Sequence, residues 1–190
     1  MLITPREVFD LIAMSLILGF IFKDIFKPHQ FMDLDGVRIP LRASTLNWKD
    51  IGFAALVTAP AVVLHELAHK FVAIAFGVSA TFYTSYTWLF IGLLLKMFNS
   101  PILFFIPGYV QHAATTNLQG SLIALAGPLM NLIIFVICYF ALKNPNIKQR
   151  YKPVIGITKQ VNLFLFIFNM LPIPPFDGFQ FISGLLKAIF

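Results

Sequence analysis

Acidic residues are scarce in this chain of 190 residues, and after Asp50 only Glu66 and Asp177 remain. Charged residues make up 12% of the sequence and hydrophobic residues 58%, whereas about 25% of residues are charged in soluble proteins. This composition excludes an ordinary soluble domain. It predicts one compact membrane domain over residues 1–190.

Cysteine is also scarce. Cys138, the single cysteine, lies in an apolar run, which excludes an intrachain disulfide and argues against redox chemistry. The net charge of +6 comes from basic residues scattered over predicted helix ends and loops. This pattern indicates contact with anionic headgroups of a lipid bilayer, and we expect no nucleic-acid partner.

Long apolar runs recur along the sequence, and a helix needs about 20 such residues to cross a bilayer. The first run, Val8–Phe26, includes charged residues and has no small-residue cleavage site, so we expect a retained helix and not a removed signal peptide. The polar stretch Lys27–Asp50 predicts a hairpin or loop outside the hydrocarbon. Further helices are predicted over Ile51–Phe76, Leu118–Leu142, Val154–Met170 and the short run Phe179–Phe190.

The region between the second and third long runs has a different pattern. Ala80–Tyr86 is rich in strand formers and lacks helical periodicity. Two short apolar pieces follow, Trp88–Phe98 and Ile102–Val110, and we expect a re-entrant or sheet-like insertion that protein shields from lipid. One broken helix is the alternative. The predicted fold is an all-α polytopic membrane protein with five to six transmembrane helices and a small membrane-inserted β or re-entrant region.

An H-E-x-x-H motif occupies residues 65–69 of the second apolar run. Residues four apart share a helix face, so His65 and His69 can bind one metal ion. Glu66 borders the same site, where it can take a proton from a metal-bound water and return it to a leaving amine. A carboxylate at the bilayer centre costs about 2.5–3.5 kcal/mol, so a functional role is the default expectation. The alternative is a histidine pair bonded to backbone or water, with Glu66 pairing with Lys70.

A catalytic zinc ion needs three protein ligands and one open position, so a third donor is required. Asp177 and His112 are the downstream candidates. Asp177 is better placed, because the proline-rich segment Leu171–Phe176 breaks the preceding helix and could fold a carboxylate back into the bundle. Its alternative role is to cap the helix that starts near Phe179. His112 is expected at the membrane boundary.

Two separated motifs resemble the site-2 protease family of intramembrane metalloproteases. The H-E-x-x-H motif is the first. The second signature, N-x-x-P-x-x-x-x-D-G, is matched in register by Asn169, Pro172, Asp177 and Gly178. Residues Ala126–Asn131 also resemble the glycine-proline-asparagine element of the family's middle core helix, where Gly120, Ala124 and Gly127 recur at a spacing that favours close helix packing. The resemblance covers residues 61–178.

The resemblance implies a catalytic core with zinc held by His65, His69 and Asp177. It also implies that Glu66 activates the water and that Asn169 donates to the developing oxyanion. The implied substrates are single transmembrane segments of membrane-tethered proteins, cut during regulated intramembrane proteolysis. The strand-like region 80–86 falls where the family has a membrane-inserted sheet, to which an unwound substrate could add a strand.

Some features depart from the family or leave alternatives open. No segment resembles a PDZ or CBS domain, and the expected catalytic core spans about residues 51–178. The family topology places the basic loop Lys143–Lys152 outside the cell, so that the active site opens toward the cytoplasm, whereas the positive-inside rule places this loop in the cytoplasm. A membrane-embedded metallopeptidase acting on soluble or misfolded chains is one alternative. A non-catalytic metal-binding protein is another, but Glu66 argues against it because a structural site needs no base.

Overall fold

The computed structural model describes residues 2–26, 31–34, 37–40, 47–100 and 106–190. Its helices, in chain order, are α1 (Pro5–Phe22), α2 (Trp48–Ala75), α3 (Tyr86–Met97), α4 (Asn117–Lys143), α5 (Lys152–Asn169) and α6 (Asp177–Ile189). A short 3₁₀ turn, Gln149–Tyr151, precedes α5. The strands are β1 (Phe31–Leu34), β2 (Val37–Pro40), β3 (Ala80–Thr84) and β4 (Gly108–His112).

Local sequence explains where several helices begin and end. In α1 the Thr4 hydroxyl accepts from the Glu7 amide, and the Glu7 carboxylate accepts from the Thr4 amide. Thr116 and Gln119 form the same reciprocal pair at the start of α4. These capping boxes satisfy amides that have no partner inside the helix. The second apolar run ends at Gly77, whose φ of 75° favours glycine.

Helices α2 and α4 contain 28 and 27 residues, which makes each about 40 Å long. In the described part of the chain, these two are the helices long and apolar enough to cross a membrane. α1 matches the first predicted run, but it includes Arg6, Glu7 and Asp10. The prediction of five to six transmembrane helices therefore stays a prediction, while the mostly helical fold is confirmed.

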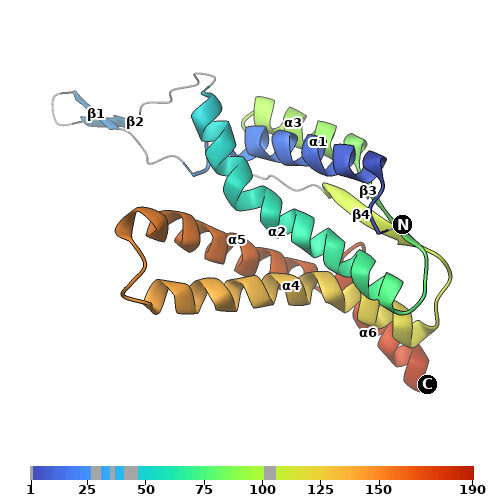
Figure 1. The fold of residues 1–190 in the computed structure, drawn as a ribbon. Helices are drawn as coiled ribbons and strands as arrows, with labels where there is room; N and C mark the ends of the chain where they lie inside the picture. The colour runs from blue at the N-terminus through green and yellow to red at the C-terminus, as the bar shows by residue number, and fades with distance from the viewer. Residues whose placement is uncertain (1, 27–30, 35–36, 41–46, 101–105) are drawn as a thin grey trace.

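In Figure 1, α2 runs diagonally between the paired α1 and α3 and the antiparallel pair α4 and α5. Helix α4 contacts α2, α5 and α6, and α1 packs along α2. Small residues permit these close approaches. A Cβ on Gly19 would lie 2.7 Å from the Ile51 carbonyl oxygen, and one on Gly184 would lie 2.5 Å from the Ser121 hydroxyl. Helix α4 is thus the central element of the half that includes α5 and α6.

Two antiparallel hairpins complete the fold. β1 and β2 pair within the polar stretch before α2, which confirms the hairpin predicted there over the described residues. β3 pairs with β4 from Ala80 opposite His112 to Thr84 opposite Gly108. This pairing confirms a strand over residues 80–84 of the predicted Ala80–Tyr86 segment and a small antiparallel sheet, while insertion of the sheet in the membrane stays a prediction.

The alternative of one broken helix across the two short apolar pieces is wrong. The first piece forms α3, but the end of the second forms β4, because its backbone groups bond to β3. Residues 101–105, at the start of the second piece, lie outside the described residues.

The core around α1, α3 and β3 combines an apolar cluster with one buried ion pair. The buried members of the apolar cluster are Met14, Leu18, Phe82 and Leu89. Lys70 of α2 pairs with Glu7 of α1, and both side chains are nearly inaccessible. The Phe82 amide donates to the same carboxylate at 2.7 Å. The alternative in which Lys70 pairs with Glu66 is therefore wrong, because Lys70 points toward α1.

A second ion pair joins the C-terminal end of α1 to α3 at the surface. Lys96 donates to Asp24 at 2.8 Å, and Lys23 donates to the same carboxylate at 3.2 Å. Burial alone would raise the pKa of Asp24, but the hydrogen bonds from Lys96 and Lys23 outweigh it and lower the pKa to about 2. Asp24 is therefore ionised at neutral pH.

Candidate metal centre

Three predicted ligands from distant segments come together in the structure. His65 and His69, one turn apart on α2, bring their Nε2 atoms to 3.1 Å from each other. Oδ2 of Asp177, the first residue of α6, lies 3.1 Å from His65 Nε2 and 3.4 Å from His69 Nε2. All three side chains are largely buried. The arrangement matches a three-ligand site for one metal ion.

The position of Asp177 depends on the glycine that follows it. A Cβ on Gly178 would lie 2.4 Å from the carbonyl oxygen of Met170, just after α5. Only glycine lets the start of α6 pack this closely on the end of α5. In the described structure no side-chain capping hydrogen bond forms at the start of α6. The Asp177 carboxylate faces the histidines instead of capping its own helix.

The spacing of the three ligand atoms fits a tetrahedral ion. Zinc binds histidine nitrogen and carboxylate oxygen at about 2.0–2.2 Å, which places neighbouring ligand atoms of a tetrahedron about 3.3–3.6 Å apart. The three separations observed are 3.1, 3.1 and 3.4 Å. Three lone-pair donors turned toward one buried point repel one another unless a cation lies between them. The residues therefore fit a divalent metal ion with three protein ligands.

Gly127 of α4 leaves the space beside the two imidazoles open. A Cβ at this position would lie 2.3 Å from His69 Nε2 and 2.6 Å from His65 Nε2. Those separations are close to metal–nitrogen bond lengths and far below a normal van der Waals contact. From its spacing in the sequence, this glycine was expected to serve helix packing. In the structure its missing side chain also leaves room at the ligand atoms.

The outer nitrogens of both histidines are held by α4. His69 Nδ1 donates to the Ile123 carbonyl at 2.7 Å, and His65 Nδ1 lies 2.6 Å from Asn131 Oδ1. Asn131 also donates to Asn162 of α5. Asn162 was missed by sequence reasoning, although an amide within an apolar helical run is a signal that could have indicated it.

A cavity of about 200 Å³ adjoins the three ligands. Glu66 and Asn169 both line it, Glu66 from α2 and Asn169 from the last residue of α5. Residues of β4 and the end of α5 form other walls. A carboxylate, an amide and a candidate metal centre thus share one space large enough to admit water and part of a peptide.

His112, the other candidate for the third ligand, also lines this cavity from the end of β4. Of the residues described, those forming the ligand cluster are His65, His69 and Asp177, and His112 is outside it. Its Nδ1 donates to the Ala113 carbonyl at 2.8 Å. The geometry therefore favours Asp177 as the third donor.

Comparison with known proteins found similar sequences in three microorganisms. The chain is 38% identical over 121 residues to "Putative zinc metalloprotease MJ0611" of Methanocaldococcus jannaschii, covering 61% of each protein. It is 28% identical over 155 residues to "Putative zinc metalloprotease sll0528" of Synechocystis, covering 82% of this chain and 36% of the relative. It is 30% identical over 141 residues to "Putative zinc metalloprotease YwhC" of Bacillus subtilis, covering 65% of this chain and 64% of the relative.

The aligned regions span less than two thirds of each of these relatives. No family model matches the chain. No solved structure matches it. The sequence comparisons thus relate this chain to proteins named as zinc metalloproteases, and the structure adds a three-ligand cluster built around an H-E-x-x-H motif.

Proposed function

We propose that this protein is an intramembrane zinc metalloprotease of the site-2 protease type, which hydrolyses peptide bonds within transmembrane segments of membrane-tethered proteins. The observation that carries the proposal is the convergence of His65, His69 and Asp177 beside Glu66 in one cavity. The names of the three relatives support both the metal and the reaction class.

The chain's own residues divide the chemistry. Zinc, held by His65, His69 and Asp177, supplies a Lewis acid when bound. Glu66 takes a proton from the water that attacks the peptide carbonyl and passes it to the nitrogen of the leaving amine as the C–N bond breaks. Asn169 donates a hydrogen bond to the oxygen on which negative charge develops.

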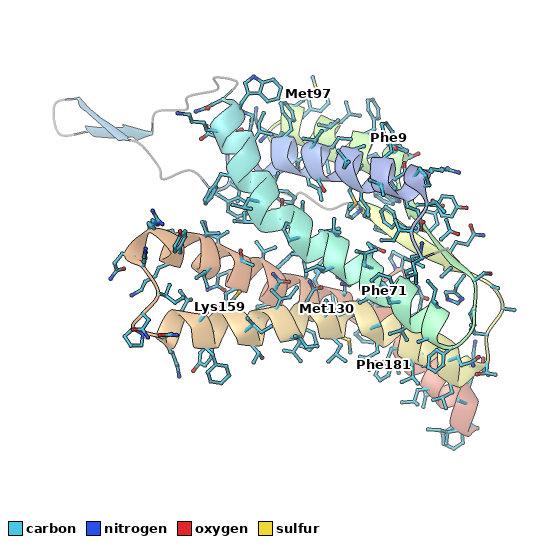
Figure 2. All side chains as sticks on the ribbon, in the orientation of Figure 1. Phe9, Phe71, Met97, Met130, Lys159 and Phe181 are labelled. Atoms are coloured by element: carbon cyan, nitrogen blue, oxygen red, sulfur yellow. The ribbon has the colours of Figure 1, made fainter. Side chains whose placement is uncertain are left out.

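The exposed surface of the helices supports a membrane location. Large apolar side chains line α4 and are 40–63% exposed at Leu122, Leu129, Ile133, Val136, Ile137 and Phe140. Figure 2 draws similar side chains on other helices, among them Phe9, Phe71 and Met97. Soluble monomers rarely expose extended apolar surface, and lipid chains would cover it here. This supports a multi-pass protein in the cell membrane.

The depth of the site follows from its place on α2. His65 lies about 25 Å along the helix from Trp48 and about 15 Å from Ala75. If α2 crosses the bilayer, these distances put the metal centre inside the hydrocarbon. A peptide bond within a transmembrane segment lies at the same depth. From the resemblance to site-2 proteases, we further propose that the cavity opens toward the cytoplasm.

Strand β4 offers a way to hold the substrate. Gly108, Tyr109 and Val110 of β4 line the cavity, and among the described strands β4 pairs with β3 along one edge. An unwound substrate segment could bond to the other edge, which would present an extended peptide to the metal centre. Extended backbone is also the conformation in which a carbonyl is open to attack by water.

The test uses the purified protein with a transmembrane-segment substrate. We expect wild-type protein to cleave it, and Glu66→Gln to cut the rate about 10²–10⁴-fold while zinc content stays unchanged, because the base is not a ligand. Undiminished cleavage by Glu66→Gln would reject the mechanism. A preference for casein over the membrane substrate would instead favour a peptidase acting on soluble or misfolded chains.

A further inference from the structure

A chain of buried amides connects His65 to α5, behind the metal centre. His65 Nδ1 lies 2.6 Å from Asn131 Oδ1, Asn131 Nδ2 donates to Asn162 Oδ1 at 2.9 Å, and Asn162 Nδ2 donates to the Thr158 carbonyl at 2.8 Å. Both asparagines are fully buried, and neither lines the cavity. They can therefore act on the site only through His65.

Main-chain carbonyls set the donor and acceptor of each hydrogen bond in this series from His65 to Thr158. The Thr158 carbonyl can only accept, so Asn162 presents Nδ2 to it and Oδ1 to Asn131. Asn131 must then present its NH₂ group, whose second hydrogen goes to the Ala61 carbonyl at 3.0 Å. This leaves Asn131 Oδ1 facing the imidazole, which must carry its proton on Nδ1.

The same result is reached at His69 by a shorter route. Its Nδ1 donates directly to the Ile123 carbonyl, so in the neutral ring Nε2 carries the lone pair. Ile123, Gly127 and Asn131 are spaced four residues apart and lie on one face of α4. The first and last hold the two rings, and the glycine between them leaves the space for the ion.

We propose that Asn131 and Asn162 are positioning residues, which fix the orientation and tautomer of His65 so that Nε2 faces the metal ion. The inference rests on the proposed function only in requiring that the site binds zinc. Outer partners of metal-bound histidines typically change metal affinity about 10–100-fold. His65 depends on removable side chains for its orientation, whereas His69 depends on a main-chain carbonyl.

The test measures zinc affinity by chelator competition in the full-length purified protein. We expect Asn131→Leu, which removes the acceptor at similar size, to weaken zinc binding about 10–100-fold. Asn131→Asp keeps an acceptor for Nδ1 but loses both donated bonds, so it should bind zinc more weakly than wild type and clearly more tightly than Asn131→Leu. If Asn131 only holds helices together, Asp should fail like Leu, since neither can donate to Ala61 and Asn162.

A second readout reports the tautomer directly. With ¹⁵N-labelled histidine, the metal-free wild-type protein should show His65 protonated at Nδ1, whereas Asn131→Leu should show a mixture of tautomers. Thr58→Val is the matched control, because Thr58 is equally buried on α2 but bonds only to Ala54 of its own helix. We expect this control to keep the zinc affinity and the His65 spectrum of wild type.

Asn162→Leu keeps the test decisive if Asn131→Leu does not fold. It leaves Asn131 in place but removes one of the two acceptors that orient it, and we expect a loss of about 3- to 10-fold in zinc affinity. Unchanged affinity in the folded asparagine variants would overturn the proposal. Wild-type protein that binds zinc without cleaving peptides would refute the protease function and leave this inference intact.

Discussion

The protein buries polar groups in two regions that differ in how donors and acceptors are matched. Around α1, the Glu7 carboxylate accepts from Lys70, from the Phe82 amide and from the Thr4 amide, so charge and hydrogen bonds balance internally. Around α2 and α6, the atoms of His65, His69 and Asp177 that face one another are all suited to accept. The first region is complete as a structural ion pair. The second has the arrangement expected of a site that holds a cation.

This difference distinguishes a structural cluster from a functional one. Among the described residues, every fully buried side-chain nitrogen or oxygen has a hydrogen-bond partner, so counting unsatisfied atoms does not separate the two regions. The balance of donors and acceptors does separate them, because three acceptor atoms held 3.1–3.4 Å apart are stabilised by a positive charge between them. Substitutions in each region should therefore have different consequences.

The largest effect is expected from removing a ligand. Asp177→Ala and His65→Ala should each reduce bound zinc from one ion per chain to nearly none, because a two-ligand site binds zinc weakly. Metal analysis of purified protein measures this directly. His112→Ala is the control and should keep its zinc, and a fully loaded Asp177→Ala protein would remove Asp177 from the site.

Adding a methyl group at position 127 should weaken zinc binding almost as much as removing a ligand does, although all three ligands stay in place. Gly127→Ala places a Cβ 2.3 Å from His69 Nε2, so we expect zinc affinity to fall by about 100-fold or more, at least as much as loss of an outer partner. Gly156→Ala is the matched control, because a Cβ there meets nothing within 4 Å. Equal zinc content in both variants would contradict the proposed position of the ion.

Breaking the ion pair between Glu7 and Lys70 should lower the free energy of unfolding and leave the zinc affinity unchanged. Lys70→Met leaves the buried Glu7 carboxylate without its cation. Removing one partner of a buried pair lowers the free energy of unfolding by about 3–5 kcal/mol. The double change Glu7→Gln with Lys70→Met should recover part of this loss. Denaturant unfolding in detergent measures the free energy, and chelator competition on the folded fraction should give wild-type affinity.

The smallest effect is expected at the surface pair of Asp24 and Lys96. Because Asp24 is 43% exposed, solvent screens the interaction, and Asp24→Asn should cost less than about 1 kcal/mol at neutral pH. Its folded pKa of about 2 is below the ordinary 3.8, so the stabilisation is present above pH 3.8 and is lost as the pH falls through 2. Thermal unfolding from pH 5 to pH 2 should show the two proteins converging.

The sequence predicted those parts of the fold and site that depend on local patterns. Leu118–Leu142 was predicted as a helix and α4 covers Asn117–Lys143, because an apolar run of that length allows few other structures. His65, Glu66 and His69 lie on one helical turn, so their spacing alone indicated a shared site. Asp177, 112 positions from His65, was selected from few remaining donors and from the resemblance to site-2 proteases.

The missed features depend on how helices face one another. The Glu7–Lys70 pair and the Asn131–Asn162 bond each join two helices, and their formation depends on helix rotation and crossing, which local periodicity does not define. The piece Trp88–Phe98 had no signal that separated a short helix from a strand, and it forms α3. Tertiary contacts with α1 decide its position.

The tight junction between Gly178 and Met170 links the geometry of the candidate metal centre to the packing of two helices. It fastens the start of α6 to the end of α5, and α5 also includes Asn162 and Asn169. Any tilt of this pair of helices relative to α2 would therefore move Asp177, Asn169 and Asn162 together. The geometry of the candidate metal centre thus depends on one backbone contact that lies outside the H-E-x-x-H motif.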